Sequence, residues 1–245
     1  MIKKAKSLFR LYRACCIRIL SCMMAAPLAP KSCVILAPHP DDETFGCGQL
    51  IAECAASQKK VYVVFLSDGT GSHQNCCDLS PLALAEKRRG DAFKAMKILG
   101  VPEENLYFCD LPDGRLSEAI PSKYNDLKNL IASFQCNTLL VPHPEEGWAD
   151  HLAVTRLGNE LADALQLKLY YYCVWFYFSM PFRKFINVKW RSSCFSYLPV
   201  TYEKKCAACN IYLKNLASCG NPYAGALPHE LISAIISPKE VFFER

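Results

Sequence analysis

The sequence predicts an α/β protein with a Rossmann-like, mostly parallel sheet that has helices on both faces. Two observations lead to this prediction. Short runs that are apolar throughout and rich in β-branched residues recur along the chain, which is typical of strands covered on both faces. Longer amphipathic segments alternate with these runs, as expected where helices connect parallel strands. The chain has 245 residues and no internal repeat, so one main domain is expected.

The predicted strands are the short apolar runs. The first covers residues 33–37 (Cys-Val-Ile-Leu-Ala) and ends at Pro38. Further strands are predicted at 60–66, 105–109 and 138–141, and the apolar run at 169–178 is predicted as another buried strand. No run reaches the roughly 18 apolar residues that suggest a membrane-spanning helix.

The predicted helices are the amphipathic segments between these strands. They cover residues 48–57, 81–99, 124–134 and 151–165. Gly100 stops the second of them, and Asp150 is the expected N-cap of the last. Strand and helix therefore alternate through most of the chain.

The charge of the chain is concentrated at its N-terminus. The net charge is +5, and all seven charged residues before Asp41 are basic: Lys3, Lys4, Lys6, Arg10, Arg13, Arg18 and Lys31. The rest of the chain has 21 basic against 23 acidic residues, so it lacks the basic surface of a nucleic-acid-binding protein. We therefore divide the chain into a basic N-terminal arm, residues 1–28, and a main domain, residues 29–245.

The arm has three interpretations. The stretch 17–27 resembles the apolar part of a signal peptide, although Arg18 interrupts it. A helix over about residues 1–26 would place Leu8, Leu11 and Tyr12 on one face, and such a basic helix can lie on an anionic membrane. It could equally be a packed or solvated leading helix.

The 15 cysteines do not form the pattern of a disulfide scaffold. Their number is odd, and many lie inside apolar runs, which is typical of buried thiols in a reducing compartment. Cys206 and Cys209 have metal-binding spacing, but no second pair accompanies them, and Cys76 and Cys77 are adjacent. A cytoplasmic protein is therefore expected, with the inner face of the membrane as a peripheral location.

The fold predicts where the chemistry lies. In open parallel sheets, ligands bind outside the carboxyl ends of the strands, at the point where the strand order reverses. The loops that begin at Pro38, Ser67, Asp110 and Pro142 should meet there.

The first of these loops carries a candidate metal site. It reads Pro-His-Pro-Asp-Asp-Glu over residues 38–43. Three adjacent acids repel one another unless a cation or hydrogen bonds compensate, and a divalent metal is the simplest explanation. His39 and Asp42 can both turn towards one ion, which leaves Asp41 facing a metal-bound water. Helix capping would explain one or two of the acids, but not His39 between two prolines.

The fourth loop, residues 143–151, supplies a second histidine. His151 lies at a helix start near the same sheet edge, and it would complete a site of two histidines and one carboxylate. Catalytic zinc typically has three protein ligands and an open position for water.

These residues resemble a known family. The run 37–44, followed by Gly46 and Gly48, resembles the signature of the LmbE-like/PIG-L family of zinc-dependent N-deacetylases. The resemblance continues at residues 68–73, 88–92, 111–114 and 150–154, and it covers roughly residues 33–157.

The resemblance implies roles for individual residues. His39, Asp42 and His151 match the family's zinc ligands, and Asp41 matches its general base. Arg88 matches a residue that contacts substrate, and Asp113 belongs to a matching motif. Glu43 is expected to orient a ligand.

One position departs from the family pattern. The family has a histidine three positions before its last ligand, where this chain has Trp148. His143 is the nearest substitute and is expected to be catalytic. His73 is another and is expected to bind substrate. Trp148 itself could stack on a sugar ring or simply pack.

The implied function is a zinc-dependent hydrolase that removes the acetyl group from an N-acetylglucosamine-type sugar in a glycoconjugate. The substrate is either a lipid- or polymer-linked sugar, as in cell-envelope glycan biosynthesis, or a soluble sugar conjugate, as in thiol or antibiotic biosynthesis. The alternative is a non-catalytic protein of the same fold that binds zinc and sugar. A nucleotide-dependent oxidoreductase is excluded, because Gly46-x-Gly48 lacks the third glycine of the dinucleotide fingerprint and the acidic loop would repel pyrophosphate.

Overall fold

The structure, a computed structural model, describes residues 2–24, 26–73, 77–181, 184, 187–188, 190, 193–195 and 199–245. Residues 1 and 25 of the arm, and Cys76, lie outside the described residues. No helix in the described part of the chain combines the length and the apolar character needed to cross a membrane.

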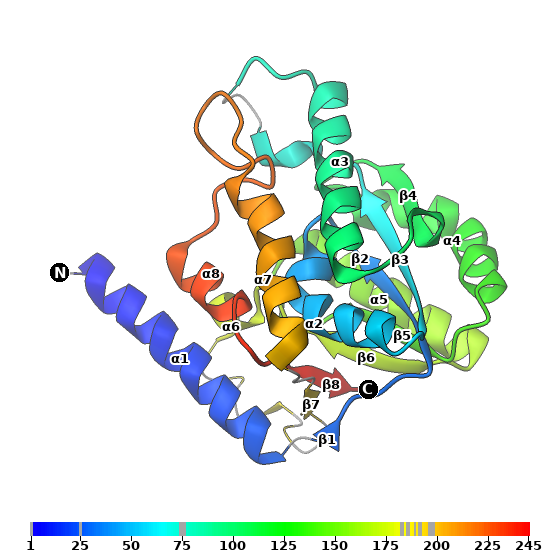
Figure 1. Cartoon of the computed structure of the whole chain (residues 1–245), viewed down its shortest axis with the longest axis horizontal. Helices are drawn as coiled ribbons and strands as arrows, with labels where there is room; N and C mark the ends of the chain where they lie inside the picture. Colours follow the sequence, from blue (N-terminus) through cyan, green and yellow to red (C-terminus); the bar gives the residue numbers. More distant parts are fainter. Residues whose placement is uncertain are drawn as a thin grey trace.

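One mixed sheet organises the described residues (Figure 1). Its eight strands follow the order β1-β7-β8-β6-β5-β2-β3-β4. The strands are β1 (Ala26–Pro27), β2 (Ser32–Ala37), β3 (Lys60–Ser67), β4 (Leu106–Leu111), β5 (Thr138–Pro142), β6 (Lys168–Tyr172), β7 (Ser193–Phe195) and β8 (Phe242–Glu244). β2 to β6 are parallel, whereas β8 runs antiparallel to both β6 and β7. The predicted α/β fold with a mostly parallel sheet is confirmed.

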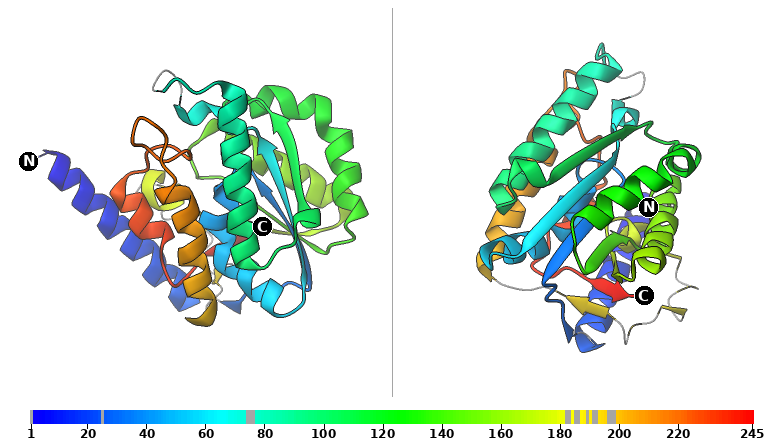
Figure 2. Two further views of the ribbon diagram at one scale, coloured as in Figure 1. Left: turned by 45° about the horizontal axis from the view of Figure 1, so that its top comes forward. Right: turned by 90° about the vertical axis from the view of Figure 1, so that its right-hand side faces the viewer.

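Helices cover both faces of the sheet (Figure 2). The helices are α1 (Ile2–Met24), α2 (Asp42–Ala56), α3 (Pro81–Leu99), α4 (Leu116–Ser133), α5 (Ala149–Leu165), α6 (Phe176–Ser179), α7 (Pro199–Lys214) and α8 (His229–Ile235), with short 3-10 turns η1 (Thr70–His73) and η2 (Glu103–Asn105). Alternate residues of β2 point to opposite faces. Ile35 packs with α2, α3 and α7, whereas Val34 and Leu36 pack with α4 and α5. This alternation explains why the strand is apolar at every position.

Helix α2 begins earlier than the sequence predicted, at Asp42 rather than at Gly48. A Cβ atom on Gly46 would lie 2.4 Å from Cδ2 of Tyr172. Gly46 is therefore needed for the close approach of helix and sheet, and it does not mark a loop. Asp42 and Glu43 of the acidic loop thus lie in the first turn of a helix.

Two further boundaries differ from the prediction. Helix α4 begins at Leu116 rather than 124, because its first amide is capped by the distant Asp150, whose Oδ1 accepts a hydrogen bond from the Leu116 amide at 3.1 Å. The apolar run 169–178 is not one strand. The chain leaves the sheet after Tyr172, and the amides of Val174, Trp175 and Phe176 turn to the Glu146 carboxylate.

Helix α1 lies against α6, α8 and β7 (Figure 1). Arg13 is buried, and its guanidinium donates to the carbonyl oxygens of Tyr177 and Met180. Arg18 donates to the carbonyl oxygens of Ser233 and Ala234. Two of the basic residues of the arm therefore bind the body of the protein.

Candidate functional site

The candidate site lies where the strand order reverses. The chain proceeds outward from β2 through β3 to β4, and then returns to the other side of β2 with β5. The loops after β2 and β5 therefore meet at one sheet edge, where they border a cavity of about 400 Å³. Its walls include His39, Asp41, Asp42 and His151.

The start of α2 brings three side chains of one loop together. The Asp42 amide donates to the His39 carbonyl oxygen at 3.3 Å, and the Phe45 amide donates to the Asp41 carbonyl oxygen at 2.9 Å. The His39 amide in turn donates to Oδ2 of Asp42 at 3.1 Å. This tight turn holds His39 and Asp42 side by side, with Asp41 at the helix N-cap position.

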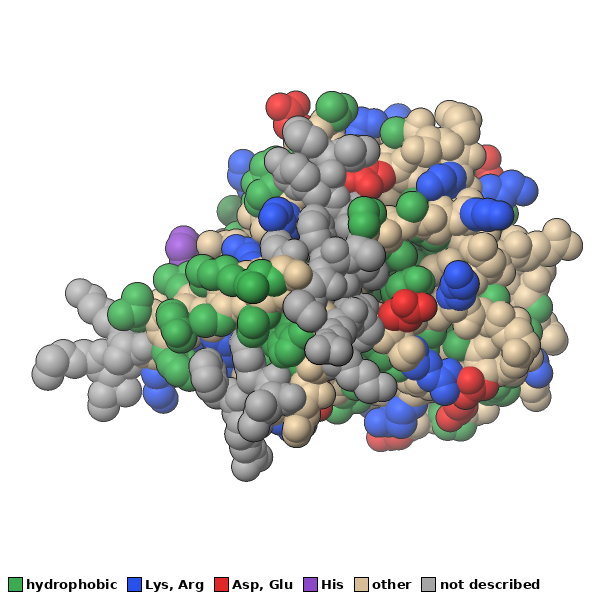
Figure 3. Space-filling model, turned by 90° about the horizontal axis from the view of Figure 1, so that it is seen from below, with side chains coloured by type: hydrophobic (Ala, Val, Ile, Leu, Met, Phe, Trp, Pro, Cys, Tyr) green, Lys and Arg blue, Asp and Glu red, His purple; other side chains and the backbone are tan. Residues whose placement is uncertain are grey.

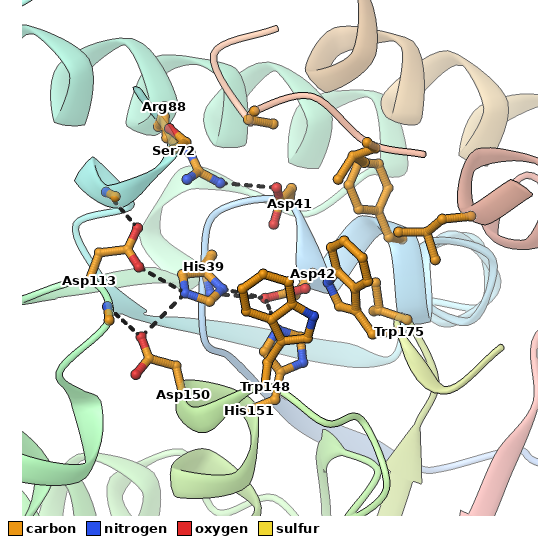
Figure 4. A pocket seen from close by; sticks show the side chains of 18 of the residues that line it. His39, Asp41, Asp42, Ser72, Arg88, Asp113, Trp148, Asp150, His151 and Trp175 are labelled. Atoms are coloured by element: carbon orange, nitrogen blue, oxygen red, sulfur yellow. Dashed lines mark hydrogen bonds and ion pairs between the residues drawn. The ribbon is translucent and has the colours of Figure 1, made fainter. Parts of the chain in front are cut away.

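Two imidazoles meet one carboxylate oxygen in the cavity (Figure 4). Oδ2 of Asp42 lies 3.1 Å from Nδ1 of His39 and 3.3 Å from Nε2 of His151. His151 comes from the first turns of α5, so the two loops contribute to a single cluster. The three potential ligand atoms all lie within 4.8 Å of one another.

Three more carboxylates hold the outer nitrogens of the two histidines. Nε2 of His39 lies 3.1 Å from Oδ1 of Asp113 and 3.4 Å from Oδ2 of Asp150. Nδ1 of His151 lies 3.3 Å from Oε2 of Glu146, a charge contact without hydrogen-bond geometry. Carboxylates behind metal-binding histidines typically fix the ring orientation and the tautomer.

The cluster has the electrostatics of a cation site. Burial opposes ionisation of Asp42, but the two histidines outweigh it and hold the pKa of Asp42 well below its usual range. Burial also opposes the charged form of His151, but the Asp42 and Glu146 carboxylates raise its pKa to about 9. The buried carboxylates thus favour positive charge at the point where the imidazoles meet.

The residues present fit a divalent metal ion. Their donor set is two imidazole nitrogens and one carboxylate oxygen, which is a set that catalytic zinc uses. The remaining side of the cluster faces the cavity, which leaves room for water and substrate. The fit rests on the convergence of His39, Asp42 and His151.

Asp41 lies in the same cavity and has a different partner. Nη2 of Arg88 donates to Oδ2 of Asp41 at 3.0 Å, and both side chains are buried. Burial raises the pKa of the Asp41 carboxyl to about 8, although the Arg88 charge opposes this shift. The Asp41 amide donates to Oε2 of Glu43 at 2.9 Å. Glu43 therefore fixes the loop itself, and does not orient a metal ligand as the sequence predicted.

Arg88 and Asp113 line the cavity, as expected of substrate-binding residues, but both have protein partners. Arg88 also donates to the carbonyl oxygens of Gly69, at 2.8 Å, and Pro40, at 3.0 Å. Asp113 accepts a hydrogen bond from the Gly71 amide at 2.8 Å besides contacting His39. In the structure, both residues support other side chains of the site.

Two tryptophans form an aromatic wall at the cavity (Figure 4). Trp148 is 50% exposed, and its ring centroid lies 4.9 Å from that of Trp175, with the planes tilted by 49°. Trp148 precedes α5, three residues before His151. Its ring therefore remains accessible to a ligand.

His143 does not lie in this cavity, which corrects the catalytic role expected of it. It is buried among the rings of Tyr171, Phe176 and Phe243 and borders a second cavity. Burial lowers its pKa to about 3, so it stays neutral. The reason is positional: His143 directly follows β5, before the chain turns towards the site.

His73 is also absent from the cavity wall, whose lining from this segment is Gly71 and Ser72. Its ring instead contacts the Pro222 carbonyl oxygen and the Cys77 and Cys219 thiols. This corrects the substrate-binding role expected of it. Cys206 and Cys209 belong to none of the candidate metal groups among the described residues, and Cys209 is fully buried.

The sequence prediction missed three residues of the site. Asp150 was expected to cap α5, but it lies in the first turn of that helix and contacts His39. Glu146 and Trp175 had no local signal. The sequence shows an acid-rich loop around Glu146 and an aromatic run around Trp175, but it does not indicate which residue of each faces the site.

The fold and the site define a class of protein: an α/β protein with a histidine–aspartate–histidine cluster at the switch point of its sheet. Residues 34–162 match the family model PIG-L, described as GlcNAc-PI de-N-acetylase. The chain therefore belongs to the PIG-L family. No curated protein matches it by sequence.

Solved structures show the same fold. The N,N'-diacetylchitobiose deacetylase from Pyrococcus horikoshii is 19% identical, with a TM-score of 0.61 over 77% of this chain and 72% of that chain. The deacetylase of the A40926 pseudoaglycone is 16% identical, with a TM-score of 0.65 over 88% of this chain and 97% of that chain. The 4-carboxy-2-hydroxymuconate hydratase from Pseudomonas putida is 18% identical, with a TM-score of 0.64 over 87% of this chain and 95% of that chain. At these identities, the likeness establishes the fold alone.

Proposed function

We propose that the protein is a zinc-dependent N-deacetylase that removes the acetyl group from an N-acetylglucosamine-type sugar of a glycoconjugate. The observation that carries the proposal is the convergence of His39, Asp42 and His151 beside Asp41 in one cavity. Membership of the PIG-L family supports the same reaction. The hydratase with this fold shows that the fold alone does not determine the reaction.

The reaction needs a nucleophilic water and an activated acetyl carbonyl. His39, Asp42 and His151 would hold the metal, and a bound zinc ion would polarise the carbonyl and acidify the water. Asp41 accepts the proton that this water loses, because its carboxylate is the remaining carboxylate of the motif that faces the cavity.

Arg88 positions the proton acceptor. Its three hydrogen bonds, to Gly69, Pro40 and Asp41, fix the guanidinium in place. The Arg88 charge lowers the pKa of Asp41 against the effect of burial, and a metal ion held by the neighbouring cluster would lower it further, towards the ionised form. A general base must be ionised to accept a proton, so Arg88 serves the reaction through Asp41.

The aromatic wall supports a sugar substrate. Trp148 and Trp175 border a cavity whose other side carries the charged cluster. One face of a sugar ring is apolar and can pack on such rings, while its acetamide reaches the metal ligands. Two structural neighbours are deacetylases of N,N'-diacetylchitobiose and of the A40926 pseudoaglycone, which is consistent with this class.

A non-catalytic zinc- and sugar-binding protein is the second candidate. Trp148 favours it, because it replaces the histidine that the family has at this position, and His143 does not take its place. Loss of one oxyanion-stabilising donor typically slows such reactions by about a hundredfold or more. The cavity would then bind the sugar without turnover.

Metal analysis and an amine-release assay on N-acetylglucosamine conjugates test the proposal. We expect one zinc ion at this cluster, lost in His151→Ala and kept in His229→Ala, a control at an exposed histidine. Asp41→Asn should keep the metal but lose turnover, because an amide cannot accept the proton. Asp126→Asn, at an exposed aspartate, is the matched control.

Two results would contradict parts of this assignment. Full metal content at the cluster in His151→Ala would remove the ligand role. Near-normal turnover by Asp41→Asn would remove the base role. Sugar binding without amine release by the wild-type, metal-loaded protein would establish the second candidate instead.

We also propose that α1 attaches the protein to the inner face of a membrane. Its outer stripe is apolar and exposed, with Leu8 69% and Met23 74% exposed, together with Tyr12 and Ile19. These residues recur at helical spacing, so they form one face (Figure 3). A lipid-linked sugar would then be reached from the membrane surface.

We expect this attachment to depend less on lipid charge than the basic residues of the arm suggest. Arg13 and Arg18 bind carbonyl oxygens of the body, and Arg10 lies 3.9 Å from the centre of the Phe178 ring. The outward stripe is apolar, so insertion should depend on hydrophobic burial more than on lipid charge.

Vesicle co-sedimentation of the full chain tests this proposal. Leu8→Ser combined with Ile19→Ser should reduce binding several-fold, and added salt should change it little. The control is Leu82→Ser, at a leucine on α3 that is 71% exposed. If the double variant binds vesicles as well as the wild type, or instead only dissociates a dimer, the stripe does not attach to lipid.

A further inference from the structure

A second cluster of metal-binding side chains lies outside the candidate active site. Nδ1 of His73 lies 3.4 Å from Sγ of Cys77 and 3.6 Å from Sγ of Cys219. The three atoms lie within 4.8 Å of one another. The cluster shares no residue with His39, Asp42 and His151.

The two nitrogen–sulfur distances suit tetrahedral zinc. Zinc bonds of about 2.3 Å to sulfur and 2.0–2.1 Å to nitrogen, set at the tetrahedral angle, place the nitrogen about 3.5 Å from each sulfur. The two observed distances lie within about 0.1 Å of this value. The two sulfurs lie within 4.8 Å of each other, so a small movement of the thiol side chains would let one ion contact all three atoms.

The orientation of His73 is the one that a ligand needs. Nε2 lies 2.7 Å from the Pro222 carbonyl oxygen, which can only accept, so Nε2 carries the hydrogen. In the neutral ring, Nδ1 then has a lone pair directed at the two thiols. A backbone carbonyl behind a histidine is a common arrangement at metal sites. His73 is only 6% exposed, so the ring has little freedom to turn.

The two thiols are accessible to an ion. Cys77 is half-buried and Cys219 is exposed. An ion bound there would have three protein ligands and a fourth position open to water. Thiolate and imidazole ligands together select zinc over magnesium or calcium.

The cluster joins two segments that are far apart in the sequence. η1 and the loop after α7 lie side by side in both views (Figures 1 and 2), and the Ser72 hydroxyl donates to the Tyr223 carbonyl oxygen at 2.9 Å. Gly71 and Ser72 from one segment, and Ala224 and Gly225 from the other, line the active-site cavity. A bond between these segments would fix one rim of that cavity.

We propose that His73, Cys77 and Cys219 form a second zinc site that clips these two loops together. On binding, both thiols release their protons to solvent, and both sulfurs and Nδ1 donate lone pairs to the ion. No electron transfer occurs. The proposal is independent of the proposed deacetylase activity, because it rests on other residues.

Cobalt substitution tests the site with a readout that the first cluster cannot produce. The full chain is reduced, freed of metal and titrated with Co²⁺. Thiolate ligands give an intense near-ultraviolet charge-transfer absorption that histidine and carboxylate ligands lack. We expect this absorption in the wild type and in His151→Ala, and its loss in Cys77→Ser and Cys219→Ser.

Cys206→Ser is the matched control, since Cys206 is half-buried on α7 and outside the cluster. Zinc content measured in parallel should fall by one equivalent in Cys219→Ser, an exposed position where serine leaves the fold intact, as circular dichroism would verify. No charge-transfer absorption in the wild type would overturn the proposal, as would an absorption that persists in both cysteine variants. A Cys77–Cys219 disulfide that survives reduction and prevents cobalt binding would also overturn it.

Discussion

Asp42 illustrates how one side chain can organise a site. A single oxygen of its carboxylate contacts both imidazoles and also accepts the His39 amide. The outer nitrogens of both rings are in turn held by Asp113, Asp150 and Glu146. At the scale of the residue, carboxylates fix the ring orientations of both histidines, as is typical of metal-binding sites.

Trp148 should contribute to substrate binding and not to metal binding. It faces the cavity and is half exposed. Trp148→Ala should raise KM for an N-acetylated sugar about 2- to 12-fold, corresponding to a ring contact of about 0.5–1.5 kcal/mol. Metal content should not change. An unaltered KM, with loss of thermal stability alone, would show that Trp148 only packs against Trp175.

The same position offers a gain-of-function test. Trp148→His restores the residue that the PIG-L pattern has three positions before the last ligand. If a missing donor limits the reaction, kcat should rise about tenfold or more, while sugar binding weakens. The comparison with Trp148→Ala separates the new imidazole from the lost indole, because only the histidine variant should increase kcat.

Helix α2 connects the core to the site at the scale of the element. Its first turn supplies Asp42, while Gly46 in its second turn lies against Tyr172. The Tyr172 hydroxyl donates to the Leu36 carbonyl oxygen at 3.0 Å, next to the loop that carries His39. Packing of α2 on the sheet thereby fixes the position of its first turn, which carries Asp42.

Gly46→Ala tests this contact. The added Cβ would lie 2.4 Å from Cδ2 of Tyr172, so helix or ring must move. We expect a loss of about 1–3 kcal/mol in the free energy of unfolding, measured by urea denaturation. Gly90→Ala on α3 is the control, because a Cβ there meets no atom within 4 Å. It should stabilise the protein by about 0.5–1 kcal/mol. Equal effects of the two substitutions would contradict the close-packing argument.

The whole molecule is organised around its switch point. One core cluster packs beneath α2, α3 and α7, and another beneath α4 and α5, with the sheet between them. A third, smaller cluster joins α1 to α6 and α8 through Ile17, Phe176 and Ala234. His143 lies at the edge of this region, where its ring packs against Phe176 and Phe243.

The burial of His143 predicts an acid-sensitive contribution to stability. Burial lowers its pKa from 6.5 to about 3, so the folded protein keeps it neutral while the unfolded chain takes up a proton below about pH 6.5. The contribution is therefore complete above pH 6.5 and is lost as the pH falls towards 3. The free energy of unfolding lost between pH 7 and pH 5 should amount to about 2 kcal/mol.

Urea denaturation of the wild type and His143→Gln at pH 7 and pH 5 measures this contribution. The free energy of unfolding of the variant should fall less between the two pH values, since glutamine does not titrate. Equal pH dependence in the two proteins would show that His143 is not responsible.

The sequence by itself determined the fold class, the strands β2 to β5 and the place of the candidate site at the ends of β2 and β5. These features depend on local patterns: apolar runs, helical spacing, and a loop of His and Asp that follows a buried strand. The convergence of His39, Asp42 and His151 could be expected because carboxyl ends of parallel strands share one edge.

Only the tertiary structure decided which side chains support that cluster and which do not. Asp150 and Glu146 contact the histidines through loops whose paths depend on distant amides, at Leu116 and Val174. His143 and His73 were close to the right loops in sequence, but a few residues of backbone turn each side chain away from the cavity. The start of α2 and the outward apolar face of α1 likewise depend on what packs against them, at Tyr172 and Tyr177. Local sequence determines helix and strand propensity and hydrophobic periodicity. The start of α2 and the directions of these side chains are instead set by contacts between residues far apart in the chain.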